Sequence, residues 1–392
     1  MDNTCNSHEL LRAQMARLGE MAFYQEKFQK CGIRPEDVKS FADLVHLPFL
    51  TRRELEEECR QLHPPLGRLF TEKVVRINLT PTTTGFLPIY FTGRDIEVTR
   101  EVNARLYRAA GVCPADLVAN CMGYHVFIAG LLHNDGLEHL GAKVIPLGPG
   151  ESERAVSVIN HYGVSVLVSN PSFAIKLAQL GANKIRVLIA GGEPVAKEII
   201  KAHFTQITVI DSYGLAECSP VARECTEESG LHIADEYVFV EIVDPETGEC
   251  LPEGEKGEIV ITHLQREAMP LLRFRTGDLA VLTRKPCPCG RQLSFPHGIL
   301  GRTDQMVKVK GVKLYPSQVA VLAKEFPGLT GKYQVKVSRR QGTDWLEITF
   351  EGEPKVDVDL LREKLKTTLI IIPNDLKIVN CLVEAGIFDE RG

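Results

Sequence analysis

The strongest restriction on the fold is the regular alternation of short apolar runs with helical segments between about residues 95 and 210. Short buried strands that alternate with helices of this length are typical of a parallel sheet that helices cover on both faces. The expected strands are DLVANC (116–121), AKVIPL (142–147), VSVLVS (164–169), IRVLIA (185–190) and ITVID (207–211), and the expected helices include 151–161, 171–180 and 194–204.

The pattern changes on either side of this region. Apolar residues at helical spacing predict a helix over 7–30. From about residue 236 the sequence EYVFVEIVDPETGECLPEGEKGEIVITHL predicts two strands joined by a turn-rich segment. We therefore expect an α/β protein with a large N-terminal domain (1–303), built from helix-covered parallel or mixed sheets plus a β-rich subdomain, and a small α+β C-terminal domain (304–392).

Composition excludes several classes of function. The net charge is −5, and no long Lys/Arg run provides the basic surface that nucleic-acid binding needs. The longest apolar stretches, VFIAGLL (126–132) and TLIIIP (368–373), are too short to cross a bilayer. The first residues lack the apolar core of a secretion signal, and eleven scattered cysteines do not suggest a disulfide framework. A cytoplasmic protein that binds neither nucleic acid nor membranes is expected.

Four loop segments could bind a ligand. GGEP (191–194) and SYGLAE (212–217) follow expected parallel strands, where ligands bind in open α/β sheets. Asp278 lies at a turn between two later strands. In TPTTTGFLP (80–88), three threonines before a glycine can direct hydroxyls and N–H groups at a phosphate. Taken singly, each segment is better explained as a turn, a helix start or an exposed carboxylate than as a ligand site.

The order of these segments resembles the phenylacetate–CoA ligase family of adenylate-forming enzymes. The Thr/Gly loop precedes GGEP, YGLAE, RFRTGD and GRTDQMVKVKG (301–311), in the succession found in that family. FYQEKF, LPFLTRREL, EAMPLLRFRTGDL, CPCGR and GVKLYPSQV extend the resemblance over nearly the whole chain. It implies ATP-dependent activation of a carboxylic acid, with an aryl acid expected, to an acyl-adenylate and pyrophosphate, followed by transfer to coenzyme A.

The resemblance also implies roles for individual residues. Those expected to be catalytic are Thr83 and Thr84 of the phosphate loop, Glu217 as a Mg²⁺ ligand, and Arg302 at the ribose or phosphates. Asp278 is expected to accept hydrogen bonds from the ribose, and Tyr213 to stack on the adenine. The other expected nucleotide-binding residues are Gly85, Gly191, Gly192, Glu193, Pro194, Asp211, Ser212 and Gly214.

Further implied residues concern the acid and the domain motion. Tyr124, His125 and Pro220 are expected to line the acyl pocket, and Asp304 is the expected hinge of the small domain. Since relatives often carry glycine at the place of His125, this imidazole favours an acid with a hydrogen-bonding ring substituent. The resemblance also suggests a homodimer whose substrates are a small carboxylic acid and ATP.

A zinc site is expected from four thiol and imidazole groups. Cys225 and His232 lie in one segment, and Cys287 and Cys289 lie in another. Four such ligands suit tetrahedral Zn²⁺, although their spacing is not that of a zinc finger. Related ligases carry a structural zinc in matching segments. The alternatives are a turn with cysteines near the surface and a solitary core histidine.

Two departures leave the reaction open. Pro81 cannot donate an N–H group, and Phe86 replaces the lysine expected at the phosphate loop. The chain ends in EAGIFDERG, about two residues before the family's adenylation lysine is expected. Arg391 is the nearby cation, and the other candidates are Lys308, Lys310 and Lys313. The alternatives to a CoA ligase are an adenylating enzyme with another acceptor or with AMP transfer to a cofactor, and a nucleotide-binding protein with little catalysis.

Overall fold

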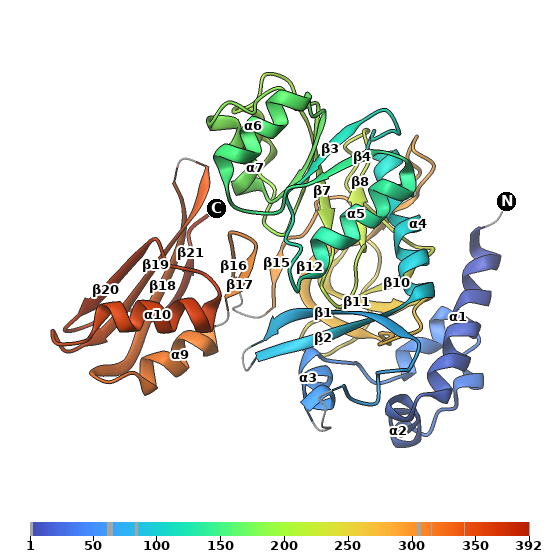
Figure 1. Cartoon of the computed structure of the whole chain (residues 1–392). Coiled ribbons are helices and arrows are strands. Elements are labelled where there is room, and N and C mark those ends of the chain that lie inside the picture. Colours follow the sequence, from blue (N-terminus) through green and yellow to red (C-terminus); the bar gives the residue numbers. More distant parts are fainter. Residues whose placement is uncertain are drawn as a thin grey trace.

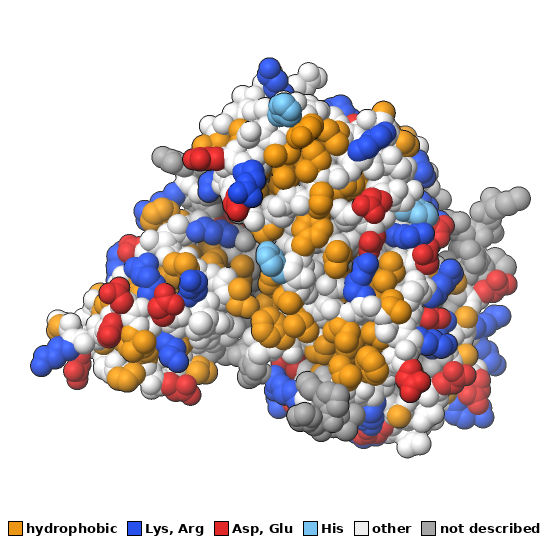
Figure 2. All heavy atoms as spheres, in the orientation of Figure 1, with side chains coloured by type: hydrophobic (Ala, Val, Ile, Leu, Met, Phe, Trp, Pro, Cys, Tyr) orange, Lys and Arg blue, Asp and Glu red, His pale blue; other side chains and the backbone are white. Residues whose placement is uncertain are grey.

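The computed structural model describes residues 3–60, 66–82, 85–303, 307–314, 316–340 and 342–391. They form a large N-terminal lobe and a small C-terminal lobe, which lies at the left of Figure 1. The N-terminal helices and the small lobe lie on opposite sides of the molecule (Figure 1). On the face shown in Figure 2, charged side chains of both signs cover the small lobe, whereas hydrophobic patches are scattered over the large one.

The core of the large lobe is a nine-stranded sheet, as counted over the described residues, with the order β13-β14-β9-β8-β7-β6-β5-β3-β4. Its parallel half, β3 to β7, contains the strands expected from the sequence, and β8, β9, β14 and β13 extend the sheet beyond β7 with antiparallel pairing. The strands are β3 (Leu117–Asn120), β4 (Lys143–Pro146), β5 (Val166–Ser169), β6 (Val187–Gly191), β7 (Thr208–Tyr213), β8 (Ala222–Glu224), β9 (Leu231–Ile233), β13 (Thr283–Arg284) and β14 (Leu293–Phe295).

Helices cover both faces of this sheet because successive side chains of each buried strand point to opposite sides. On β5, Val166 and Val168 belong to a cluster with Tyr107 and Leu137, whereas Leu167 belongs to another with Ile159. The helices are α4 (Gly93–Ala109), α5 (Ile128–Leu140), α6 (Ser152–Tyr162), α7 (Pro171–Gln179) and the short α8 (Lys197–Lys201). The expected α/β class with a helix-covered sheet is confirmed.

The remainder of the large lobe packs into one extended core. It contains the hairpin β1 (Val74–Thr82) and β2 (Gly85–Thr92), and a four-stranded sheet of β10 (Val238–Val243), β11 (Lys256–His263), β12 (Phe274–Val281) and β15 (Gly301–Arg302). The single helix expected over 7–30 is instead two, α1 (Asn3–Glu20) and α2 (Ala22–Cys31), because Met21 takes an extended backbone. Both helices bury apolar side chains in the same core. Two 3₁₀ turns, η1 (Pro35–Asp37) and η2 (Phe41–His46), lead to α3 (Arg52–Arg60).

The small lobe has its own hydrophobic core between one sheet and two helices. Its sheet has the order β20-β19-β18-β21, and the hairpin β16–β17 lies beside it. The elements are β16 (Val307–Val309), β17 (Val312–Leu314), α9 (Pro316–Glu325), β18 (Leu329–Arg340), β19 (Thr343–Gly352), α10 (Val358–Leu369), β20 (Asp375–Val379) and β21 (Gly386–Asp389). Because Asp304 lies outside the described residues, the domain boundary at 303/304 stays a prediction.

The described residues of the two lobes touch at several places. Gln318 on α9 donates a hydrogen bond to the Thr82 carbonyl oxygen at the end of β1, at 3.2 Å. Gly311 lies against Asn170, because a β-carbon on Gly311 would lie 2.1 Å from Nδ2 of Asn170 and would displace that side-chain amide. Gly342, beside the tip of the β18–β19 hairpin, lies against Ile175 of α7. The small lobe therefore covers both the Thr-rich hairpin and the ends of the parallel strands.

Candidate active site

A cavity of about 780 Å³ lies where the ends of the parallel strands meet the small lobe. Expected nucleotide-binding residues line it, and so do residues of the small lobe that sequence analysis did not assign. The former are Gly191, Gly192, Ser212, Tyr213 and Gly214, and the latter include Gly311, Val312, Asp344, Trp345 and Asn374. This is the edge of an α/β sheet where ligands bind.

Asp278 forms the centre of a hydrogen-bonded group at this site. The Tyr213 hydroxyl donates to Oδ2 of Asp278 at 2.7 Å, and Nη1 of Arg302 donates to Oδ1 at 2.5 Å. The Asp278–Arg302 contact follows from strand pairing, since these residues are directly opposite on β12 and β15. Burial, and then the Asp278 charge, raise the pKa of Tyr213 well above its ordinary value. The phenol therefore stays protonated and holds the carboxylate in place.

Glu217, the expected magnesium ligand, is buried and forms an ion pair with Arg52 of α3. Nη2 of Arg52 also donates to the Pro81 carbonyl oxygen at 2.9 Å. Arg52 thus connects Glu217 to the Thr-rich hairpin. Sequence analysis missed this residue, although it lies within the LTRREL stretch that supported the family resemblance. Thr83 and Thr84 lie outside the described residues, while Gly85 adopts a φ of 139° that favours glycine.

Lys308 on β16 is half-buried and brings an ammonium group from the small lobe to the same site. It lines the cavity, and its charge interacts with those of Asp278, Glu217 and Asp211 and with that of Arg302. Burial is the main reason that the pKa of Lys308 is below its ordinary value. Lys308 therefore brings a positive charge to the expected reaction centre.

The other candidate cations have different surroundings. Lys310 lines the cavity and donates to Oδ1 of Asn374 at 2.8 Å. Arg391 binds Oδ2 of Asp344 at 3.0 Å and the Lys308 carbonyl oxygen at 2.6 Å, and thereby ties the last strand to the β16 hairpin. The side chain of Lys313 lies outside the described residues.

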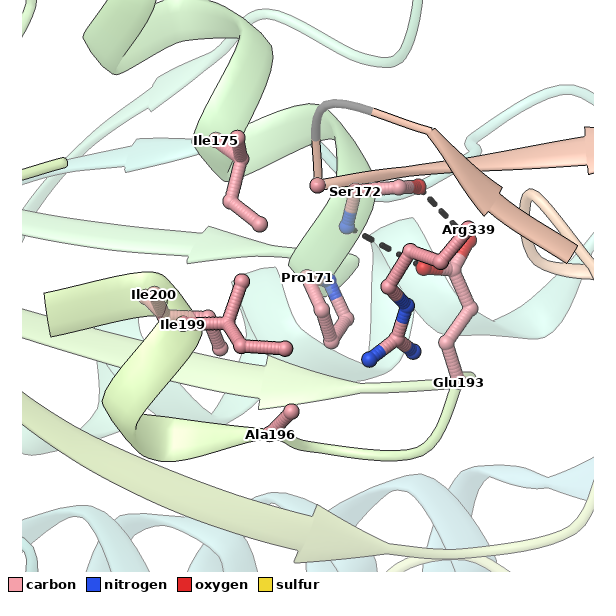
Figure 3. Close-up of a pocket in the computed structure, with 9 residues that line it drawn as sticks. Pro171, Ser172, Ile175, Glu193, Ala196, Ile199, Ile200 and Arg339 are labelled. Carbon is pink, nitrogen blue, oxygen red and sulfur yellow. Dashed lines mark hydrogen bonds between the residues drawn. The ribbon is translucent and has the colours of Figure 1, made fainter. Parts of the chain in front are cut away.

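The GGEP segment is held by the start of α7. Glu193 accepts hydrogen bonds from the backbone N–H and the hydroxyl of Ser172, at 3.1 and 2.9 Å (Figure 3). Burial, and then the Asp344 charge, raise the pKa of Glu193. Gly191 must be glycine, because a β-carbon would lie 2.8 Å from the Ser212 carbonyl oxygen. Pro194 follows as an exposed residue.

Asp211 lies at the end of β7, beside these segments. Its backbone N–H donates to Oε2 of Glu224 at 2.7 Å, and Glu224 in turn binds Lys197 at 2.9 Å. Burial, and then the Glu224 charge, raise the pKa of Asp211 to about 7.

The expected acyl-pocket residues occupy different places. Pro220 lines the cavity. The Tyr124 hydroxyl donates instead to Oδ1 of Asn134 at 3.1 Å, and His125 is exposed, so neither is among the residues that line the cavity. His133 and Arg223 line it and were missed. His133 could have been found from helical spacing, which places it on the inner face of the helix that follows the GYHVF stretch.

The four candidate zinc ligands converge, although they come from loops far apart in the sequence. The ligand atoms of Cys225, His232, Cys287 and Cys289 all lie within 4.8 Å of one another. The Cys225 and Cys287 sulfur atoms are 3.7 Å apart. Pairing of Ser294 with His232 across β14 and β9 brings the two loops together.

Comparison with protein families finds two matching models. The model described as AMP-binding enzyme matches residues 102–265, and that of the AMP-binding enzyme C-terminal domain matches residues 311–379. The phenylacetate-coenzyme A ligase of Thermus thermophilus is 37% identical over 353 residues, which span 86% of this chain and 77% of that protein. The Escherichia coli ligase of the same name is 33% identical, over 91% of this chain and 86% of that protein. The family inferred from the motif order is confirmed.

A solved structure has the same arrangement of lobes. 2-Hydroxyisobutyryl-CoA ligase, in complex with 2-HIB-AMP and CoA in the thioesterification state, superposes with a TM-score of 0.91 at 25% identity, covering 99% of this chain and 90% of that one. The same enzyme in its postadenylation state gives a TM-score of 0.72 at 24% identity, over 98% of this chain and 89% of that one. In the described part of the chain, no helix is both long and apolar enough to span a membrane.

Proposed function

Because the chain belongs to the phenylacetate–CoA ligase family of AMP-binding enzymes, we propose that it is an AMP-forming acid–CoA ligase that accepts an aryl carboxylic acid. In the first step, a carboxylate oxygen of the acid attacks the α-phosphorus of ATP, and pyrophosphate leaves. In the second, the sulfur of coenzyme A attacks the acyl carbon, the thiol gives up its proton, and AMP leaves. A single cavity bounded by both lobes supports this sequence of steps.

The observation that carries the proposal is the placement of Lys308 beside the Tyr213–Asp278–Arg302 group. Asp278 offers a fixed carboxylate for ribose hydroxyls, and Arg302 and Lys308 offer positive charge for the phosphate of an adenylate. Because these groups are held in place before the reaction, they stabilise developing charge without reorganising. Tyr213 provides the aromatic face proposed to contact adenine.

We further propose that this arrangement of lobes belongs to the thiol-transfer step. The higher TM-score of the thioesterification-state structure supports this assignment. Gln318 supports it too, since it binds the end of the Thr-rich hairpin where the outgoing pyrophosphate is expected to have been held. Adenylate formation then requires a different position of the small lobe, with Asp304 as the proposed hinge.

Two metals are proposed. The cysteine and histidine cluster fits Zn²⁺, because sulfurs about 2.3 Å from one tetrahedral ion lie about 3.8 Å apart, close to the 3.7 Å between Cys225 and Cys287. This zinc would join two loops and take no part in the reaction. Glu217 would hold Mg²⁺, which neutralises phosphate charge. Since Glu217 is paired with Arg52 here, magnesium binding requires Arg52 to release or share the carboxylate.

The test of the proposed function is pyrophosphate release with ATP, Mg²⁺ and a panel of aryl and alkyl acids, each with and without coenzyme A. Acid-dependent pyrophosphate together with an acyl-CoA product is expected. Accumulation of acyl-adenylate regardless of coenzyme A would indicate a different acceptor, and no turnover with bound nucleotide would indicate a binding protein. A homodimer and a cytoplasmic location are also proposed, and sedimentation and cell fractionation test them.

A further inference from the structure

The inner end of the cavity contains a buried cation with no anionic partner. Arg223 on β8 is 2% exposed and lines the cavity. Its Nε donates to the Ser212 hydroxyl at 3.1 Å, and its Nη2 donates to Oδ1 of Asn103 at 3.0 Å. Both acceptors are neutral, and no ion pair joins Arg223 to a carboxylate within the described chain. Its Nη1 has no hydrogen-bond partner among those residues.

Packing fixes the guanidinium in this position. Its central carbon lies 4.0 Å from the ring centroid of Tyr107, which is fully buried on α4. The Asn103 amide donates to the Leu132 carbonyl oxygen at 3.3 Å, which leaves Oδ1 facing Arg223. Gly136 allows α4 and α5 to approach closely here, because a β-carbon would lie 2.5 Å from that of Asn103. The charge is therefore held rigidly at the cavity wall.

A second donor lies at the same end. His133 on α5 lines the cavity, and its Nδ1 is hydrogen-bonded to the Tyr107 hydroxyl. Burial, and then the Arg223 charge, lower the pKa of His133 to about 3, so the imidazole is neutral near pH 7. Burial also raises the pKa of Tyr107 to about 12, so its hydroxyl remains a donor. Nδ1 is then the acceptor, and Nε2 carries the imidazole proton.

The inner end thus presents two kinds of N–H donor, one of them charged. Leaving a buried charge unpaired is costly, whereas a bound carboxylate would compensate it and could accept from a guanidinium with two oxygens. An acid that ends in a bare hydrocarbon would leave Nη1 unpaired after the cavity closes. The donors therefore select against an unsubstituted aryl or alkyl acid.

We propose that the substrate is a dicarboxylic acid, whose second carboxylate binds Arg223 and His133 while the first is activated. The inference rests on the proposed function, since it places the acid in this cavity. It also replaces the expectation attached to His125. A polar group at the far end of the acid is retained, but its partners are His133 and Arg223.

The first test uses the purified full chain. We would measure kcat/KM for acid-dependent pyrophosphate release with phenylacetate and with two sets of its ring-substituted derivatives. One set carries a second carboxylate at the ortho, meta or para position, and the other carries a hydroxyl group at the same positions. A dicarboxylate and a monocarboxylate of equal chain length, adipate and hexanoate, extend the panel. We expect the best dicarboxylic acid to exceed its monocarboxylic counterpart by about 100-fold or more, since a site built for a polar group discriminates strongly against its absence. Equal rates, or a preference for the monocarboxylic or hydroxylated acids, would overturn the inference.

Variants of Arg223 then locate the preference. Arg223→Met keeps the length of the side chain and is expected to abolish most of the preference, measured as the ratio of kcat/KM for the dicarboxylic and the monocarboxylic acid in the same variant. Arg223→Lys should restore part of the preference, because it restores the charge. Arg284→Met, at an exposed arginine, is the control. An unchanged ratio in Arg223→Met refutes the proposal. If Arg223→Met does not fold, the acid preference of the wild-type protein and of Arg223→Lys still tests the proposal.

Failure of the proposed function gives a different result. If the proposed function is wrong, no acid in the panel releases pyrophosphate from ATP. The ratio of kcat/KM for dicarboxylic and monocarboxylic acids then cannot be measured for any variant. With failure of the inference alone, acid-dependent pyrophosphate release and acyl-CoA formation persist, but without preference for a second carboxylate.

Discussion

Replacing Gly342 with valine should separate the two half-reactions. Gly342 lies beside the tip of the β18–β19 hairpin, which meets α7 and α8 of the large lobe (Figure 3). A β-carbon at this position would lie 3.0 and 3.1 Å from two side-chain carbons of Ile175 and 3.4 Å from Nε2 of His203. These contacts join the two lobes, so they exist only while the small lobe is docked as it is here.

The size of the effect follows from these distances. Carbon atoms pack best at about 3.5–4.0 Å, so the β-carbon alone intrudes by roughly half an ångström, and the γ-carbons of valine intrude further. Overpacking of this kind costs about 1–3 kcal/mol. The φ of 77° at Gly342 adds a cost of about 1–2 kcal/mol, but that cost belongs to the hairpin and is the same in every arrangement of the lobes. Only the steric part shifts docking, by about 10- to 100-fold.

The assay measures each step alone. Pyrophosphate release in a single turnover without coenzyme A reports adenylate formation, and mixing preformed acyl-adenylate enzyme with coenzyme A reports thioester formation. We expect Gly342→Val to slow the second step by about 10- to 100-fold and to change the first by less than about 3-fold. Gly331→Val is the matched control, because Gly331 also has a positive φ, of 93°, but its β-carbon would meet only Lys324, at 3.6 Å. Equal slowing of both steps, or an unchanged second step, would refute the reasoning.

Three further predictions can be checked with single variants. Lys308→Met should slow thioester formation by about 100- to 1,000-fold, the cost of removing one preorganised donor from a transition state, whereas Lys336→Met, at a half-buried lysine elsewhere in the small lobe, should not. Equal rates in both variants would remove Lys308 from the site. Cys287→Ser should reduce bound zinc, measured by mass spectrometry, from one ion per chain to none and lower Tm, while Cys113→Ser retains the metal. The pKa of His133 is about 3 in the folded protein, against about 6.5 for an unperturbed histidine. Between about pH 3 and pH 6.5, the unfolded chain therefore binds more protons than the folded protein. The free energy of unfolding should therefore fall on acidification by up to about 1.4 kcal/mol per pH unit, and His133→Gln should lose this contribution in urea titrations.

The sequence alone was sufficient for the strands of the parallel sheet and for the family. Alternation of apolar strands with amphipathic helices depends on neighbouring residues, so the strands from β3 to β7 could be located before their partners were known. Motif order identified the family, which the relatives confirm. Sequence analysis missed β21 (Gly386–Asp389), because this strand depends on long-range pairing with β18, and its own residues show no clear strand pattern.

Tertiary structure decided which side chains share the cavity. Strand pairing brings Arg302 to Asp278, and docking of the small lobe brings Lys308 to the same group. Helix packing turns His133 inward, while His125 stays exposed. The sequence by itself thus determined the parallel strands from β3 to β7, the family and the kind of chemistry. The charge at the inner end of the cavity emerged only from the packing of α4, α5 and β8, because burial is a property of the assembled chain.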